Sequence, residues 1–171
     1  MELSDVGQWR LDWAWGLPLI VLNTVVHVIG LGLLYWKGVR ILERLVAGRH
    51  FMIVFAVGMS LAVLFAAVLH FLEAVVWATA YVLLGAMPDT KSAMLYSLNA
   101  VTTYGHTQLA LAPHWRLMGA LEALNGVLLS GLTVAALFAM IQRVLLLSSP
   151  DQQPNASARP GWNRPLGSGP T

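Results

Sequence analysis

The sequence contains no cysteine, and only 11% of its 171 residues are charged. Without cysteine the chain has neither disulfide bonds nor thiolate metal ligands. Soluble domains carry about 25% charged residues, so the low charge and an apolar fraction of 57% exclude an ordinary soluble enzyme. The ten Lys and Arg residues form no dense patch, so no nucleic-acid partner is expected. The composition predicts an integral membrane protein of one domain.

Three long apolar runs alternate with more polar segments. About 20 apolar residues span a bilayer as a helix, so each run is long enough for one crossing. The second run would reach roughly 50 Å as one helix, so it either tilts and projects or breaks. The tail is rich in proline, glycine and serine, which predicts disorder. The expected segments are an N-terminus at 1–12, a first span at 13–36, a basic loop at 37–50, a second span at 51–84, a short helix and polar loop at 85–114, a third span at 115–147 and a tail at 148–171.

Positive charge is concentrated between the first two spans. Lys37, Arg40, Arg44 and Arg49 are accompanied there only by Glu43. Positively charged loops remain on the cytoplasmic side of a membrane. We therefore expect a multi-pass protein with its N-terminus outside and its C-terminus in the cytoplasm.

A short helix followed by a polar string is expected between the second and third runs. Pro88 ends a turn, Asp89 or Thr90 can cap a new helix, and that helix, about 90–102, is too short to span. Non-helical backbone at membrane depth must be buried in protein or line water, so the string predicts a re-entrant loop. Carbonyls and hydroxyls in such a loop can replace the hydration shell of an ion. One chain supplies one loop, so a closed ring needs a cyclic homo-oligomer.

Residues 96–107, which read YSLNAVTTYGHT, resemble the pore helix and selectivity filter of the potassium channel superfamily. The run that follows from Trp115 is similar to the inner helix of the small bacterial two-transmembrane members, the pore-loop "ion channel" family. The resemblance covers about 51–143 and leaves out the first helix and the tail. It implies an all-α homotetramer in a bacterial inner membrane, with an outer helix at 51–84, a pore helix and filter loop at 85–114 and an inner helix at 115–147.

The filter of this family has the pattern Thr-Val-Gly-Tyr-Gly, and only two of its five positions match here. Thr103 and Gly105 match, whereas Thr107 replaces the second glycine. Glycines in this motif allow the left-handed dihedrals that direct carbonyls to the axis. The resemblance implies a passive channel for K⁺ or Na⁺ with poor selectivity for K⁺. The expected conducting residues are Thr102, Thr103, Tyr104, Gly105, His106 and Thr107.

Two glycines of the third run resemble inner-helix glycine positions in the family. Such glycines permit bending or close packing, so they fit a gate or a helix contact. Residues on the same helical register would face the cavity, and the two nearest its inner end could gate by dewetting. The expected cavity and gate residues are Gly126, Val127, Ser130, Gly131, Val134 and Phe138.

Two roles are open for His106. In a fourfold assembly, four copies near the axis would repel cations on acidification, because histidine changes charge between about pH 5 and 8. External acid would then inhibit flux. In the other role, which we favour slightly, His106 packs behind the filter as the tyrosine of the family does.

Two polar pairs lie within the apolar runs: His70 with Glu73, and Glu122 with Asn125. Ionisable residues in a span are candidates for function. Here we expect a structural role, in which hydrogen bonds join the outer helix to the pore helix or inner helix. A transition-metal site that combines His70, Glu73 and Glu122 with His27 is an alternative, but no dense ligand motif is present. The main expectation is no metal and no cofactor.

The expected function is passive cation transport, and no enzymatic activity is expected. The expected partners are further copies of the chain and membrane lipids. No arginine ladder and no folded ligand-binding domain are evident, so the gating stimulus is open. Two alternatives are a channel-derived scaffold that no longer conducts, because Tyr104, His106 and Thr107 distort the filter, and a small membrane metalloprotein.

Overall fold

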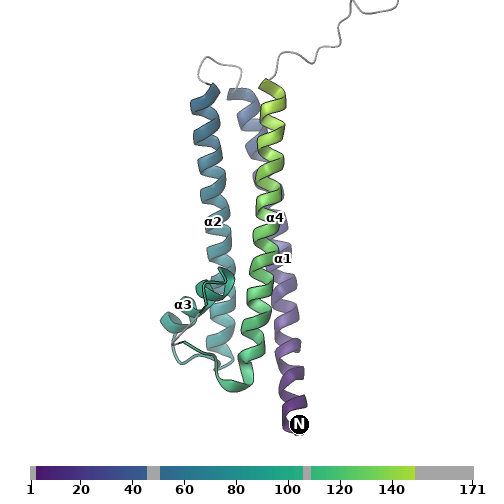
Figure 1. The fold of residues 1–171 in the computed structure, drawn as a ribbon, viewed down its shortest axis with the longest axis vertical. Coiled ribbons are helices and arrows are strands. Elements are labelled where there is room, and N and C mark those ends of the chain that lie inside the picture. The colour runs from purple at the N-terminus through teal and green to yellow at the C-terminus, as the bar shows by residue number, and fades with distance from the viewer. Residues whose placement is uncertain (1–2, 46–50, 106–108, 149–171) are drawn as a thin grey trace, which may run out of the picture.

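The computed structural model describes residues 3–45, 51–105 and 109–148, and the regular structure in these ranges is all helical. Three long helices run side by side along the long axis of the molecule, and one short helix lies against the second and third of them in their lower half (Figure 1). The elements in chain order are α1 at Leu3–Leu45, α2 at Phe51–Leu83, α3 at Thr90–Val101, a single 3₁₀ turn η1 at Pro113–Trp115, and α4 at Arg116–Ser148.

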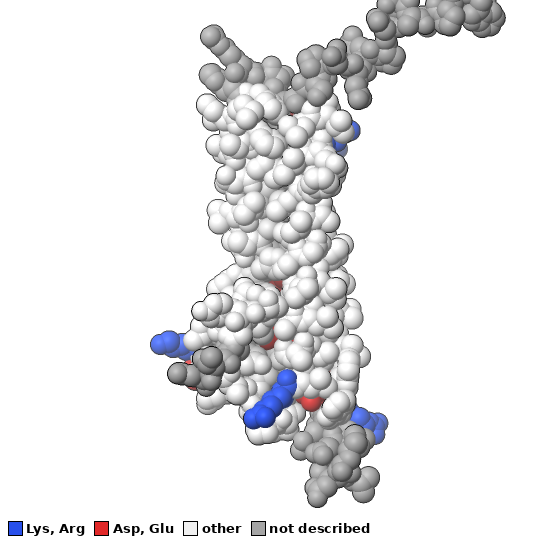
Figure 2. All heavy atoms as spheres, viewed as in Figure 1, with Lys and Arg blue, Asp and Glu red and all other residues white. Residues whose placement is uncertain are grey.

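Helices α1, α2 and α4 are each long and apolar enough to cross a membrane. Figure 2 shows that Lys and Arg lie near the two ends of the visible face, and that the long middle section has neither. Large apolar side chains such as Val21, Ile29, Leu64 and Val134 are exposed along this section. Exposed apolar surface of this extent is stable in lipid and not in water. The fold is therefore compatible with a multi-pass membrane protein.

Helix α1 is longer than the apolar run that predicts it. It begins at Leu3 and ends at Leu45, so it includes most of the expected N-terminus at 1–12 and much of the expected basic loop at 37–50. Hydropathy marks only the apolar part of a helix, whereas backbone hydrogen bonding continues into polar flanks. Val39 and Leu42 are buried in this extension, which explains why it stays helical.

Helix α2 is continuous from Phe51 to Leu83, so of the two arrangements open for the second run the structure has a single unbroken helix. It ends in a turn in which Gly85 has a φ of +67°. The Ser92 backbone N–H then donates to the Asp89 carboxylate at 2.9 Å, which caps α3 and confirms the prediction of a cap here. This hydrogen bond from Ser92 lowers the pKa of Asp89 below its usual range.

The interior has two apolar clusters. The first lies around Trp77, Tyr81 and Met118, where α2, α3 and α4 meet. The second lies around Leu42 and Met140, toward the other end of the bundle. Between the two clusters along the helices are the buried polar residues His27, Glu73 and Thr133. The bundle therefore has a polar layer in the middle of its apolar length.

Candidate functional site

The C-terminal end of α3 is held at a fixed position along α4 by a close contact between the two helices. A Cβ atom built on Gly126 would lie 2.8 Å from the Val101 Cα and closer still to the Val101 carbonyl oxygen, so only glycine fits. Gly126 is ten residues into α4, which places the contact about 15 Å from the start of that helix. Gly126 thus serves close packing, one of the two roles that the sequence left open.

The polar string that follows α3 has a strained and exposed backbone. Thr102 ends α3, and its N–H donates to the Leu98 carbonyl at 3.2 Å. Thr103 has a φ of +56° and Gly105 a φ of +85°. A positive φ is uncommon for a β-branched residue such as threonine and is often found at functional sites. Of the expected conducting residues, 102–105 are all exposed, and His106 and Thr107 lie outside the described residues.

The chain then returns to the end of the bundle from which α3 started. The Ala112 N–H donates to the Ala86 carbonyl at 3.1 Å, and this hydrogen bond joins the segment before α4 to the turn before α3. Leu111 is buried in the same cluster as Met87. Residues 90–112 therefore leave one end of the bundle and come back to the same end (Figure 1).

One face of α4 is not covered by the other described residues. Val127, Val134 and Phe138 are more than half exposed, whereas Leu129 and Met140 on another face of the helix are buried. No atom lies within 4 Å of a Cβ built on Gly131. The uncovered face includes all of the expected cavity and gate residues except Gly126, namely Val127, Ser130, Gly131, Val134 and Phe138.

Glu122 joins three helices through hydrogen bonds. The Tyr81 hydroxyl of α2 donates to Glu122 Oε2 at 2.6 Å, and the Ser97 hydroxyl of α3 makes a very short contact with Oε1. Ser97 Oγ also lies 2.8 Å from the Ala74 carbonyl. Glu122, Tyr81 and Ser97 are fully buried. Asn125, the other member of the predicted pair, is buried, and its Oδ1 has no hydrogen-bond partner among the described residues.

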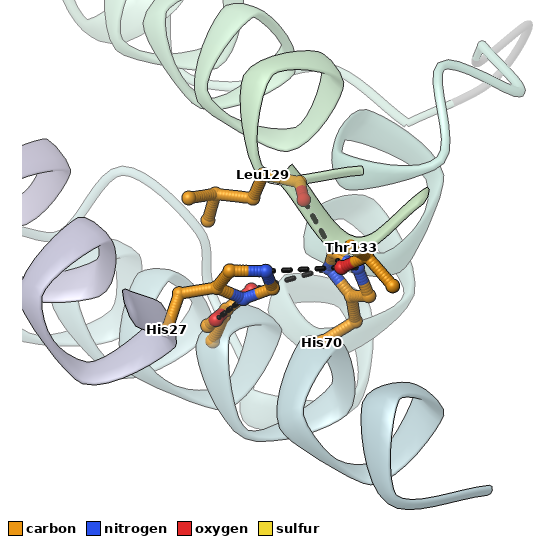
Figure 3. A network of polar contacts seen from close by, with 5 residues as sticks. His27, His70, Leu129 and Thr133 are labelled. Atoms are coloured by element: carbon orange, nitrogen blue, oxygen red, sulfur yellow. Dashed lines mark hydrogen bonds and ion pairs between the residues drawn. The ribbon is translucent and has the colours of Figure 1, made fainter. Parts of the chain in front are cut away.

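His70 and Glu73 belong to a second network, which includes His27 of α1 and Thr133 of α4 (Figure 3). His27 Nδ1 lies 2.6 Å from Glu73 Oε1, and His70 Nδ1 lies 3.2 Å from Glu73 Oε2. The Nε2 atoms of His27 and His70 lie 3.0 and 3.1 Å from Thr133 Oγ1. The four side chains form a closed ring of contacts. His27 and Glu73 are almost completely buried.

The structure divides the metal-ligand set that the sequence suggested. His27, His70 and Glu73 come together, whereas Glu122 contacts Tyr81 and Ser97 instead. Sequence reasoning did not single out Tyr81, Ser97 or Thr133. These three residues are common types in membrane helices, and nothing in their spacing indicates a partner on another helix.

An apolar groove of about 610 Å³ lies between α1 and α2, at the end of the bundle that contains Leu42 and Met140. Its lining includes Leu33, Gly38, Ile53 and Phe65, with Lys37 as a charged residue among them.

Comparison of the chain with family models, with curated proteins and with solved structures finds no match. The fold and the polar layer define a class, an all-helical protein with three candidate membrane spans.

Proposed function

We propose that the chain assembles as a homotetramer and forms a passive cation channel. One observation carries the proposal: the exposed, non-helical backbone of 102–105 begins about 15 Å along the apolar helix α4. The hydrocarbon core of a bilayer is about 30 Å thick, so with the start of α4 near one membrane surface this backbone would lie within the core. Such backbone must be covered by protein or face water. Further copies of the chain around an axis would supply both.

The direction of α3 supports a site for cations. Its C-terminal end, at Val101, leads directly into the string. A helix C-terminus carries a partial negative charge, which attracts a cation placed beyond it. Thr103 and Gly105 have left-handed dihedrals, as the residues of a carbonyl-lined filter do, and carbonyls are the ligands that replace water around a permeating ion.

The uncovered face of α4 supports the tetramer. Val127, Val134 and Phe138 would line a central cavity below the string or contact α4 of a neighbouring subunit. In a single chain this face has no partner among the described residues. The apolar side chains of Val134 and Phe138 are suited to a gate that closes by dewetting.

The distribution of charge supports an orientation in the bacterial inner membrane. Lys37, Arg40 and Arg44 lie near the end of α1, and Arg143 lies at the same end of the bundle, 3.6 Å from Glu43. Positive charge at a helix end favours the cytoplasmic side. The N-terminus and the turn before α3 would then be outside.

Flux measurements test the proposal. The purified chain is reconstituted in liposomes under separate gradients of K⁺, Na⁺ and Cl⁻, with protein-free liposomes as the control, and its mass is determined by native mass spectrometry. We expect a tetramer that passes K⁺ and Na⁺ with weak discrimination and excludes Cl⁻. A tetramer that passes no ion would identify the non-conducting scaffold instead. A monomer in bilayers would refute the shared filter.

A further inference from the structure

The Thr133 hydroxyl lies beside one backbone carbonyl and two histidine rings, so the group to which it donates its hydrogen constrains the protonation of both rings. Thr133 Oγ1 lies 3.1 Å from the Leu129 carbonyl, which accepts hydrogen bonds only. A hydroxyl has a single hydrogen, so once Thr133 donates it to Leu129, Oγ1 acts as an acceptor (Figure 3). The two Nε2 atoms that contact it, from His27 and His70, must then both carry hydrogen.

The other nitrogen of each ring faces Glu73. A neutral imidazole with hydrogen on Nε2 has a lone pair on Nδ1, and carboxylate oxygens also present lone pairs. His70 Nδ1 and Glu73 Oε2 are both buried and lie 3.2 Å apart, which is an ion-pair distance for a protonated ring, but their geometry is not that of a hydrogen bond. Lone pairs that face one another in an apolar interior need a positive charge between them.

We propose that His27, His70 and Glu73 bind a divalent first-row transition-metal ion such as Zn²⁺. Each residue offers one ligand atom, and these atoms lie within 4.8 Å of one another. Metal bonds of 2.0–2.2 Å in a tetrahedral site place ligands about 3.4 Å apart, so small side-chain rotations suffice. Two imidazoles and one carboxylate favour zinc, cobalt, nickel or copper over calcium and magnesium.

Thr133 has the role that metal-binding histidines require of a neighbour. Such histidines usually donate the remaining ring N–H to a fixed acceptor, which orients the ring. Thr133 accepts from both rings at once and is itself held by Leu129. Three protein ligands leave the fourth position of a tetrahedral ion open. The site links α1 to α2, with α4 as its support.

The proposal is independent of conduction, because the site lies on the contact between α1 and α2 and involves no residue of the string. Its test is therefore a binding measurement. The full chain, purified without a histidine tag and stripped with EDTA, is dialysed against Co²⁺ in detergent. Bound metal is counted by mass spectrometry, and the visible absorption of Co²⁺ reports tetrahedral nitrogen and oxygen ligands.

We expect one Co²⁺ per chain, displaced by Zn²⁺, and loss of stoichiometric binding in His27→Gln, His70→Gln and Glu73→Gln. Glu122→Gln and His114→Gln are matched controls, since they replace a buried carboxylate and an exposed histidine outside the site. Both should bind Co²⁺ as the wild type does. Circular dichroism monitors the fold of each variant.

A pair of substitutions at Thr133 keeps the test valid if a ligand variant fails to fold. Thr133→Val removes the acceptor of both rings and should weaken Co²⁺ binding about 10- to 100-fold. Thr133→Ser keeps the hydroxyl and should bind within a few-fold of the wild type. If the wild type binds no Co²⁺, protons alone hold the ring together and the proposal is overturned. Binding that survives the His27 and His70 substitutions would overturn it equally.

Discussion

Gly126 of α4 lies directly against the backbone of Val101, the last residue of α3, and a Cβ atom at Gly126 would come within 2.8 Å of the Val101 Cα. The partner is backbone and not the end of a flexible side chain, so it cannot move aside alone. This contact fixes the position along α4 at which the polar string follows α3.

Gly126→Ala should destabilise the protein by about 1–3 kcal/mol, because α3 must move away from α4 to admit the methyl group. Unfolding in detergent, followed by circular dichroism, measures the change. Gly131→Ala is the matched control, since nothing lies within 4 Å of its Cβ position. It should be neutral or stabilise by up to about 1 kcal/mol, because alanine favours a helix over glycine. Equal destabilisation by both variants would contradict a packing role for Gly126.

Tyr81→Phe should destabilise the protein by about 1.5–3 kcal/mol, because it removes a buried hydroxyl that donates to Glu122. Ser97 contacts the same carboxyl group, so Tyr81→Phe and Ser97→Ala should be non-additive in a double-mutant cycle. Tyr104→Phe is the control, because that side chain is 84% exposed. Additive effects of the first two variants would show that Glu122 does not couple them.

Among the described residues, two glycines have a positive φ, and substituting each of them separates an effect on conduction from an effect on stability. Gly105 has a φ of +85° and Gly85 a φ of +67°, and a Cβ at either one would meet no atom within 4 Å. Alanine therefore introduces backbone strain of about 1–3 kcal/mol at each position. If the string conducts, Gly105→Ala reduces liposome flux whereas Gly85→Ala leaves flux unchanged at equal tetramer yield. Equal flux in both variants would refute conduction through the string.

The start of α3 should depend on pH through Asp89. The folded-state pKa of this carboxyl is lowered by the hydrogen bond from Ser92, so the charged form stabilises the helix. This stabilisation is present above the usual aspartate range and is lost as the pH falls through the folded-state pKa. Hydrogen exchange of the first turn of α3 should therefore become faster at acidic pH.

Two substitutions separate the charge of Asp89 from its capping role. Asp89→Asn still accepts the bond from Ser92 and should lose only the pH dependence. Asp89→Ala should accelerate exchange at every pH. A pH dependence that persists in Asp89→Asn would assign it to another group.

The absence of cysteine makes the orientation directly measurable. Single-cysteine variants Lys91→Cys and Arg44→Cys place a thiol at the start of α3 and in the last turn of α1, and both positions are exposed. A membrane-impermeant maleimide applied to intact spheroplasts should label position 91, and position 44 only after permeabilisation. The reverse pattern would invert the proposed topology.

Features that depend only on residues close together in the sequence were predictable from it. The break at Pro88, the cap at Asp89 and the short helix after it follow from local backbone chemistry, and the structure has all three. The three spans follow from hydropathy. The helical spacing of Val39 and Leu42 also indicates a short helix after the first span, but not that it continues α1 without a break to Leu45, because hydropathy falls where the polar residues begin.

The partners of the buried polar groups could not be derived in this way. His27 and Glu73 are 46 residues apart, and His27 and Thr133 are 106 apart. Whether such residues meet depends on the rotation of each helix about its axis, and a few tens of degrees would separate them. An all-apolar helix gives little indication of that rotation, because its lipid-facing and buried sides are chemically alike.

The ring around Glu73 also has a consequence for how the chain enters the membrane during synthesis. A carboxylate near the middle of a span raises the free energy of insertion by about 2.5–3.5 kcal/mol when it is alone. Its partner His27 is on α1, which emerges from the ribosome and reaches the bilayer first. When α2 leaves the translocon, a polar group is already in place to receive Glu73. Insertion of α2 should therefore be more efficient with α1 present than when it is expressed by itself.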